Sequence, residues 1–368
     1  MKRRDVITKT LIGGSAILAG CSSKSEEGSV PAVHTKKKIR WRLASSFPSS
    51  LDTLYGSAVV LADKVRDMTG GNFDIRVYPG GELVPALEVL DSVQKGSIQA
   101  GQSASYYYIG KNPALAFDCC VPFGLTARQQ AGWLHHGGGL ELTRRTFADF
   151  NILNFPAGNT GAQMGGWFKR EVNGLADMQG LKMRIPGLGG RVMAELGVAV
   201  QTLPGGEIYT ALERGAIDAT EWVGPYDDEK LGFHKVAKYY YYPGWWEPGP
   251  SLSFYVNQKE WAKLPAEYQA IFTAAAKEAE VGMLAKYDAQ NPIALNRILE
   301  QGIQMRPFAQ DIMTKAFEAA QQLLSDNAQK DPEYAKIYTS WQDSRKQLFQ
   351  WFDKAESAYA QFAFSQKL

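Results

Sequence analysis

The sequence predicts an α/β protein of two lobes, each built on an open, mostly parallel sheet with helices on both faces. Two observations lead to this prediction. Strand-like and helix-like segments alternate as β-α-β-α-β between residues 38 and 101, and the same order returns between residues 181 and 221. The chain is also too long for one domain, because its 368 residues exceed what a single hydrophobic core usually serves.

In the first half, polar and apolar residues alternate as they do in half-buried strands. Strands are expected at 38–43, 73–78 and 97–101, with helices at 51–67 and 84–95. In the second half, strands are expected at 181–185, 198–202 and 216–221, with helices at 190–196 and 206–214. Glycine and proline clusters between these segments supply the turns.

The two halves share a local pattern. Residues 90–100 (LDSVQKGSIQA) parallel residues 209–219 (YTALERGAIDA). Each predicts a helix that ends at a basic residue, followed by a glycine at the C′ position and then a strand. This parallel predicts two lobes of similar build.

The remaining segments connect the lobes and complete the chain. Strands at 151–154 and 251–257 are expected to act as hinges, because the chain must leave the first lobe and return to it. Further helices are expected at 265–286, 311–328 and 333–362, with a last strand near Met305. The division expected is lobe 1 at 37–154, lobe 2 at 155–250, a return to lobe 1 at 251–306 and C-terminal helices at 307–368. The final helix is rich in aromatic residues, so it must pack on its own body or on another subunit.

The N-terminal residues predict export. A basic start is followed by an apolar run from Leu11 to Leu18, which is too short to span a bilayer and is typical of a signal peptide at 1–20. The run ends in Leu-Ala-Gly-Cys, a pattern similar to the bacterial lipobox, in which Cys21 receives a lipid, and residues 21–36 then form a polar tether. An ordinary signal peptide with an incidental cysteine is the alternative. The Arg3-Arg4 pair resembles a twin-arginine signal, which leaves the export route open.

Charge and cysteine content exclude several classes of protein. Residues 1–20 hold four of the 40 basic and one of the 38 acidic side chains, so a chain beginning at Cys21 carries a formal charge of −1. There is no basic excess for nucleic acid. The other cysteines, Cys119 and Cys120, are neighbours in apolar sequence, which excludes a disulfide scaffold. Four scattered histidines and the lack of a phosphate-binding loop argue against a histidine metal cage and a nucleotide cofactor.

Three segments concentrate polar groups where a ligand could bind. Residues 158–168 set amides among glycines, which suits a loop that approaches a ligand closely, although a plain turn is the alternative. Arg184 ends a strand before a glycine-rich turn, where a guanidinium can grip a carboxylate with two hydrogen bonds; a surface arginine is the alternative. Glu221 closes an apolar strand before Trp222 and needs a partner, such as Arg184, a cation or a ligand hydroxyl.

Aromatic runs at 106–108 and 239–250 follow strands as well. Such runs most often pack in the core, but at these positions they can form the walls of a small-ligand pocket.

Together these motifs resemble a known family, the DctP-type solute-binding proteins of tripartite ATP-independent periplasmic (TRAP) transporters. The resemblance rests on residues 95–99 (KGSIQ), 180–186 (GLKMRIP) and 214–219 (RGAIDA), and it covers essentially the whole mature chain. Residues 158–168, 183–190, 221–226 and 244–250 resemble the branch that binds 2-oxo acids such as pyruvate, or lactate, together with a metal ion. The family implies a two-lobed α/β periplasmic binding protein with mixed sheets, a long bridging helix and long C-terminal helices.

The resemblance also implies roles for individual residues. Arg184 would clamp the ligand's carboxylate. A sodium or calcium ion would be held by Gln163, Glu221 and the backbone carbonyl of Trp222, and these oxygen ligands suit a hard cation. The ligand would also meet Asn159, one of Tyr106 and Tyr107, and Glu247 or its tryptophan neighbours. The implied partners are the TRAP membrane subunits and, through an exchanged C-terminal helix, a second copy of the chain.

Two other functions stay open at this point. A periplasmic lyase or hydrolase could use Glu221 as a base, but the sequence supplies neither a nucleophile–histidine–acid set nor a cofactor loop. A sensory receptor of the same fold would bind the same ligands but pass the signal to a kinase. The ligand itself is equally open, since pyruvate, longer 2-oxo acids, lactate and other 2-hydroxy acids all suit the same clamp.

Overall fold

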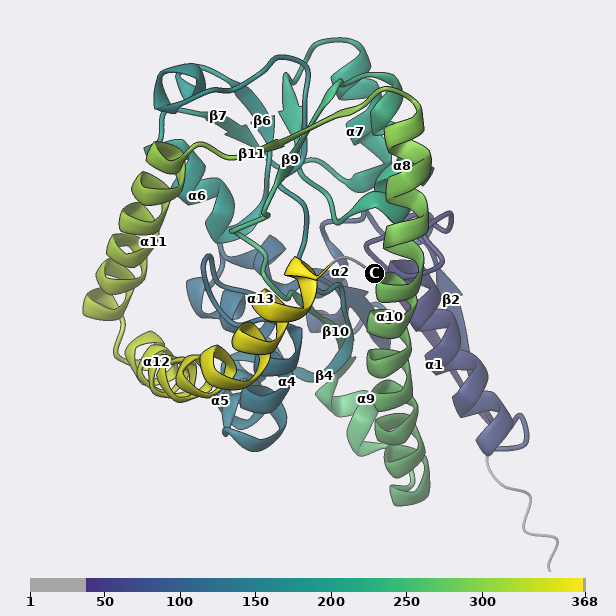
Figure 1. Ribbon diagram of the computed structural model, residues 1–368. Helices are drawn as coiled ribbons and strands as arrows, with labels where there is room; N and C mark the ends of the chain where they lie inside the picture. The colour runs from purple at the N-terminus through teal and green to yellow at the C-terminus, as the bar shows by residue number, and fades with distance from the viewer. Residues whose placement is uncertain (1–37, 367–368) are drawn as a thin grey trace, which may run out of the picture. The chain divides into compact units, whose positions relative to one another are not determined.

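The computed structural model describes residues 38–366, which form two mixed β-sheets with helices around them (Figure 1). The predicted signal peptide, the tether and the lipidated Cys21 lie outside the described residues. Among the helices of residues 38–366, none combines the length and the apolar character that a membrane crossing requires.

The first lobe is the part of the chain built on a five-stranded sheet. Its strands, in spatial order, are β2 (Phe73–Tyr78), β1 (Ile39–Ser45), β3 (Ala100–Ser103), β10 (Ser251–Asn257) and β4 (Ile152–Asn159). The first three run parallel, as the β-α-β-α-β pattern predicts. β10 runs antiparallel to both β3 and β4, so the two predicted hinge strands lie side by side and make the sheet mixed.

The helices of the first lobe cover this sheet and extend from it. They are α1 (Leu54–Met68), α2 (Val89–Gln94), α3 (Ala116–Cys119), α4 (Ala127–His136), α5 (Gly139–Ala148) and α9 (Gln258–Ala262). Their starts follow local rules. The side chains of Thr126 and Gln129 form a capping box at α4, and the side chain of Asn257 accepts the first amides of α9.

The second lobe is the part built on a six-stranded sheet. Its strands, in spatial order, are β11 (Gln304–Pro307), β9 (Tyr239–Tyr242), β5 (Trp167–Phe168), β8 (Ala219–Thr220), β6 (Lys182–Arg184) and β7 (Ala199–Gln201). Its helices are α6 (Gly187–Glu195), α7 (Gly205–Glu213) and α8 (Pro225–Leu231). β6 is parallel to β7 and β8, whereas β5 is antiparallel to both of its neighbours.

The similarity predicted between the ends of α2 and α7 is confirmed in detail. Gly96 and Gly215 follow the last helical turns with φ of 74° and 73°, a conformation that only glycine adopts at little cost. In both places the residue after the glycine donates its amide to a carbonyl five residues earlier, Ser97 to Ser92 and Ala216 to Ala211. The same local sequence therefore ends a helix in the same way in each lobe.

The long helix α10 (Ala266–Glu300) bridges the two lobes, and it packs on α1 and β4 of the first lobe and on α8 of the second (Figure 1). Its buried face repeats every four residues, at Ala275, Ala279, Met283 and Tyr287. The Tyr287 hydroxyl donates to Asp227 of α8, which also accepts from the Thr53 hydroxyl of the first lobe, at 2.6 and 2.7 Å. A buried carboxylate thus ties both lobes to the bridging helix.

The C-terminal helices return to the first lobe. They are α11 (Gln310–Lys330), α12 (Pro332–Phe352), a π-helical turn (Asp353–Ser357) and α13 (Ala358–Ser365). Near its start, α12 buries Tyr334, Tyr338 and Trp341 against Phe117 of α3. Farther along, α13 buries none of its residues, and Phe364 is 86% exposed.

The structure differs from the predicted elements in five places. The helix expected from residue 84 begins at Val89, because Pro85 disfavours helical geometry at the residue before it. The strand expected at 97–101 lies at 100–103, since residues 95–97 still belong to the helix end. α10 extends to Glu300, past the expected end at 286, and the last helix is divided by the π-helical turn. β11 also pairs with β9 in the second sheet, although residues 251–306 were expected to return to the first lobe.

Candidate functional site

The candidate site is built on the carboxyl ends of neighbouring parallel strands. Arg184 is the last residue of β6, and Glu221 directly follows β8, which pairs with β6 in the register Arg184 to Thr220. The carboxyl ends of parallel strands meet at one edge of the sheet, so the two side chains emerge together. Arg184 is 1% exposed and Glu221 is fully buried.

The two side chains form an ion pair inside the protein. Arg184 Nη1 donates to Glu221 Oε1 and, at 3.3 Å, to the Glu221 main-chain carbonyl. Arg184 Nε donates to the Leu203 carbonyl at 3.1 Å, and the guanidinium lies 5.1 Å from the ring of Trp222. The second terminal nitrogen, Nη2, is buried without a hydrogen-bond partner. The arginine is therefore held in place by three acceptors while one donor remains free.

A second buried carboxyl faces this pair. Glu247 accepts from the Tyr106 hydroxyl at 3.3 Å, and this contact joins the second lobe to the first. Burial, together with the nearby charge of Glu221, raises the pKa of Glu247 well above its usual range. Burial likewise raises the pKa of Glu221, and the ion pair with Arg184 opposes that rise. Two carboxyls and one arginine in a dry site leave an excess of negative charge whenever both carboxyls are ionised.

The glycine-rich loop at 158–168 brings two amides to the site. The Gln163 main-chain N–H donates to the Glu247 carbonyl, and its side chain donates from Nε2 to the Thr160 hydroxyl at 3.3 Å, which leaves Oε1 buried and unpaired. Asn159 is used differently, because its side chain donates to the Gly249 carbonyl and accepts from the Gly161 amide. The Asn159 side chain thus holds the backbone of the loop and does not line the cavity.

A small closed cavity lies among these groups. Its free volume is about 10 Å³, enough for about one water molecule. The lining comes from both lobes: Phe47, Leu54, Tyr106, Tyr107, Thr160, Gln163, Arg184, Trp222, Val223, Pro250 and Leu252. Of the predicted residues, Asn159, Glu221 and Glu247 are not among the lining residues: Glu221 and Glu247 reach the cavity through their contacts with Arg184 and Tyr106, and Asn159 instead lines a groove beside α10. Sequence reasoning missed Phe47, although it follows the carboxyl end of β1, the position that drew attention to Arg184.

Four buried polar atoms around the cavity have no partner. The oxygens Gln163 Oε1 and Glu221 Oε2 can only accept from a donor or bind a cation, while the donors Arg184 Nη2 and Trp222 Nε1 suit an anion. No three His, Cys, Asp or Glu side chains gather as a metal site within residues 38–366. A cation here would therefore be held by one carboxylate with amide and main-chain oxygens, a donor set that fits sodium or calcium.

Comparison with known proteins places the chain in a family. Residues 44–331 match the bacterial extracellular solute-binding proteins of family 7, abbreviated DctP. The chain belongs to this family. DctP proteins are extracytoplasmic binding subunits of transporters. The prediction of a binding protein is therefore confirmed against the alternative of an enzyme.

Closely related DctP proteins bind small carboxylates. The chain is 52% identical, over 99% of its length and 100% of the relative's, to the monocarboxylate 2-oxoacid-binding periplasmic protein of Nostoc sp.. A solved TRAP binding protein from Bordetella bronchiseptica, described as a mixed-occupancy dimer with calcium and picolinate in one site, is 47% identical with a TM-score of 0.88 over 89% of this chain and 98% of that one. One from Pseudoalteromonas atlantica, with sodium and pyruvate, is 42% identical with a TM-score of 0.86 over 90% and 100%.

The buried ion pair predicts a strong coupling between its two members. In the protein without ligand or metal, Arg184→Gln should lower the free energy of unfolding by about 3 kcal/mol, because it leaves the Glu221 charge buried and unpaired. Adding Glu221→Gln should restore most of that loss. Urea unfolding of the two single variants and the double variant, with a chelator present, measures the coupling. Additive losses in the double variant would contradict the pairing.

Proposed function

We propose that this protein is the extracytoplasmic binding subunit of a TRAP transporter and that it captures a small 2-oxo or 2-hydroxy monocarboxylate together with a cation. The observation that carries the proposal is the set of unpaired buried groups at and beside the cavity. An unpaired arginine N–H lies beside unpaired carboxylate and amide oxygens, and these groups call for an anion and a cation at once. The 2-oxoacid-binding relative, 52% identical over almost the whole chain, supports the same ligand class.

Charge balance explains why the anion and the cation would bind together. A ligand carboxylate would enter a site in which Glu221 already offsets the single positive charge of Arg184, and in which burial raises the pKa of Glu247 and favours its neutral form, so the ligand itself adds an excess negative charge. A dry site does not tolerate that excess of negative charge, and a bound sodium or calcium ion would offset it. The cation would lie between Glu221 Oε2, Gln163 Oε1 and the Trp222 carbonyl.

A carboxylate with an oxygen on the neighbouring carbon suits this arrangement. One carboxylate oxygen would accept from Arg184 Nη2, while the other and the 2-oxygen would chelate the cation. Picolinate, found with calcium in the Bordetella bronchiseptica relative, also carries a donor atom next to the carbon that bears its carboxylate. Tyr106, Tyr107, Trp222 and Glu247 would surround the rest of the ligand, and Asn159 would act by holding the loop.

Capture would proceed by closure of the lobes. The cavity has room for about one water molecule, so a ligand the size of pyruvate must enter while the lobes are apart. The hinge strands β4 and β10 and the bridging helix α10 are the connections about which the lobes would move. We place the lobe boundaries near residues 154 and 250. The closed form with its ligand would be what the TRAP membrane subunits recognise.

Removal of the arginine tests the clamp. Arg184→Ala should abolish calorimetric binding of pyruvate measured with calcium present, a loss of about 100-fold or more, because a hydrogen-bonded charge pair with the ligand disappears. Arg191→Ala is the matched control, since Arg191 lies exposed on the neighbouring helix α6. Undiminished affinity in Arg184→Ala would refute the clamp.

Neutralising the glutamate tests the cation. Wild-type protein treated with a chelator and dialysed into sodium-free buffer should lose pyruvate binding and regain it when calcium or sodium is restored. Glu221→Gln should weaken this metal dependence, because the neutral amide attracts a hard cation less than a carboxylate does. Titrations of pyruvate with and without each ion provide the measurement. If Glu221→Gln keeps the full metal requirement, Glu221 is not a cation ligand.

Two further properties extend the proposal beyond the cavity. We propose that residues 1–20 are removed on export, by either route, and that Cys21 carries a lipid anchor; mass spectrometry of the mature N-terminus decides this. We also propose a homodimer in which the exposed apolar side chains of α13, Tyr359, Phe362 and Phe364, pack on a second copy. Light scattering on Phe362→Ser/Phe364→Ser should then give a monomer and on the wild type a dimer.

A further inference from the structure

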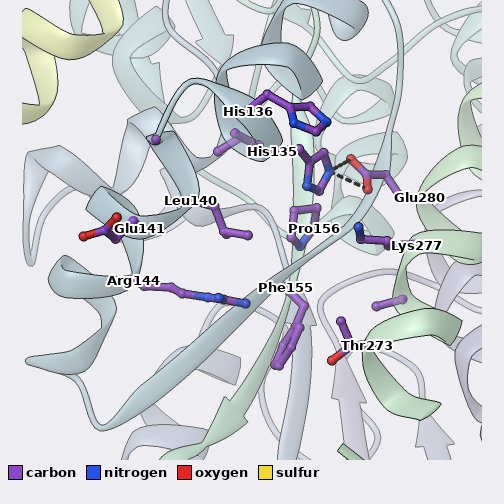
Figure 2. A pocket seen from close by; sticks show the side chains of 13 residues that line it. His135, His136, Leu140, Glu141, Arg144, Phe155, Pro156, Thr273, Lys277 and Glu280 are labelled. Carbon is purple, nitrogen blue, oxygen red and sulfur yellow. Dashed lines mark hydrogen bonds and ion pairs between the residues drawn. The ribbon is translucent and has the colours of Figure 1, made fainter. Parts of the chain in front are cut away.

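A second and larger cavity lies on the outer side of the first lobe, between α4, α5, the edge strand β4 and the bridging helix α10 (Figure 2). Its volume is about 570 Å³, within the range of small-molecule sites. It shares no lining residue with the cavity at Arg184. It is therefore a separate place at which a ligand could bind.

Two cations enter this cavity from opposite walls. Arg144 extends from α5 and Lys277 from α10, with Phe155 of β4 between them in Figure 2. Neither has an ion-pair partner among residues 38–366. Arg144 Nε is buried with no hydrogen-bond partner, and its guanidinium lies 5.4 Å from the Phe155 ring centroid. Burial lowers the pKa of Arg144, as expected for a cation that has lost solvent without gaining a close anion.

The two carboxylates in the cavity lining, Glu141 and Glu280, each have a partner of their own. Both oxygens of Glu280 contact His135 Nε2, at 2.9 and 3.1 Å, and the dashed lines of Figure 2 mark this pair. Glu141 accepts from Arg145, on the exposed side of α5. Asp118 attracts Arg144 from the interior, but its oxygens accept from Ser105, Ser253 and Asn154. The positive charges of Arg144 and Lys277 thus remain available to a ligand.

An apolar part of the lining restricts the ligand further, while His136 and Thr273 add polar groups elsewhere in the cavity. Leu134, Leu140, Phe155 and Pro156 form walls against which the free oxygens of a phosphate or sulfate would lose hydrogen bonds to water. Pro156 also removes one backbone donor from β4, which makes this sheet edge a poor template for an added peptide strand. A ligand that joins one carboxylate to a flat apolar group fits these surroundings better than a phosphate, a sulfate or a peptide strand.

From these contacts we propose that the cavity is a second binding site, specific for a monocarboxylate with an aromatic body. The carboxylate would lie between Arg144 and Lys277, replacing the counterion that both lack. The ring would lie against Phe155 and Leu140, where aromatic and aliphatic contacts add to the charge attraction. The site uses neither Arg184 nor a metal ion. A test of this second site is therefore independent of the function proposed for the cavity at Arg184.

Benzoate is the probe, and calorimetry on the full mature chain is the measurement. Arg144→Gln and Lys277→Gln should each weaken benzoate binding about ten-fold, because each removes one of two charged contacts. Arg66→Gln is the matched control: Arg66 lies on α1, its side chain is 51% exposed and paired with Asp63, and it does not line the cavity, so the affinity should be unchanged. Arg184→Ala should also bind benzoate normally, which separates this site from the cleft.

Several results would overturn the proposal. They are the absence of benzoate binding up to about 10 mM, an affinity that Arg144→Gln leaves intact, or a loss of binding in Arg184→Ala. Inorganic phosphate binding at the same site as tightly as benzoate would contradict the ligand class. Circular dichroism and thermal unfolding of each variant check the fold. If Arg144→Gln unfolds, Lys277→Gln decides alone, because the Lys277 side chain is exposed on α10 and makes no hydrogen bond or ion pair among residues 38–366.

Discussion

The buried ion pair between Arg184 and Glu221 is the constraint on which the site depends. A charge without solvent is tolerated only with a partner, so the strands that carry these residues must end side by side. The pair uses only part of each group's hydrogen-bonding capacity, and Arg184 also lines the small cavity. The protein thus holds its own charges in place while one donor nitrogen and one carboxylate oxygen stay unpaired, and the proposed function assigns these two atoms to a ligand and its cation.

The same segment that carries Glu221 also links the site to the contacts between the lobes. Four residues after Glu221, helix α8 begins, and its Asp227 binds Thr53 of the first lobe and Tyr287 of the bridging helix. The next residue, Asp228, accepts from Trp167 and Tyr240 of the second sheet. Glu221 is therefore close, along the chain, to the groups that join the lobes. Under the proposed function, the segment that would hold the cation therefore also carries contacts that join the lobes.

Much of the site could be predicted from single positions. Arg184 and Glu221 were identified because each ends an apolar strand, and charged groups at the carboxyl ends of parallel strands reach a common edge. Gln163 and Asn159 were both identified from the glycine-rich loop, but the sequence could not separate their roles. Asn159 pairs with Gly249 and Gly161, whereas one oxygen of Gln163 stays free. That difference arises from backbone atoms that are distant in sequence, and local patterns do not report their positions.

By itself, the sequence predicted most of the elements, the repeated helix ends and the charged residues that the fold brings together at one sheet edge. These features depend on periodicity, on glycine at positive φ and on charge next to apolar strands, all of which are local. The tertiary structure alone decided which groups keep a free hydrogen-bonding atom and how far α10 extends past Pro292. It also decided that Arg144 and Lys277 line the same cavity. Those properties depend on contacts between residues far apart in the chain, because burial and unpaired charge arise only when separate elements pack together.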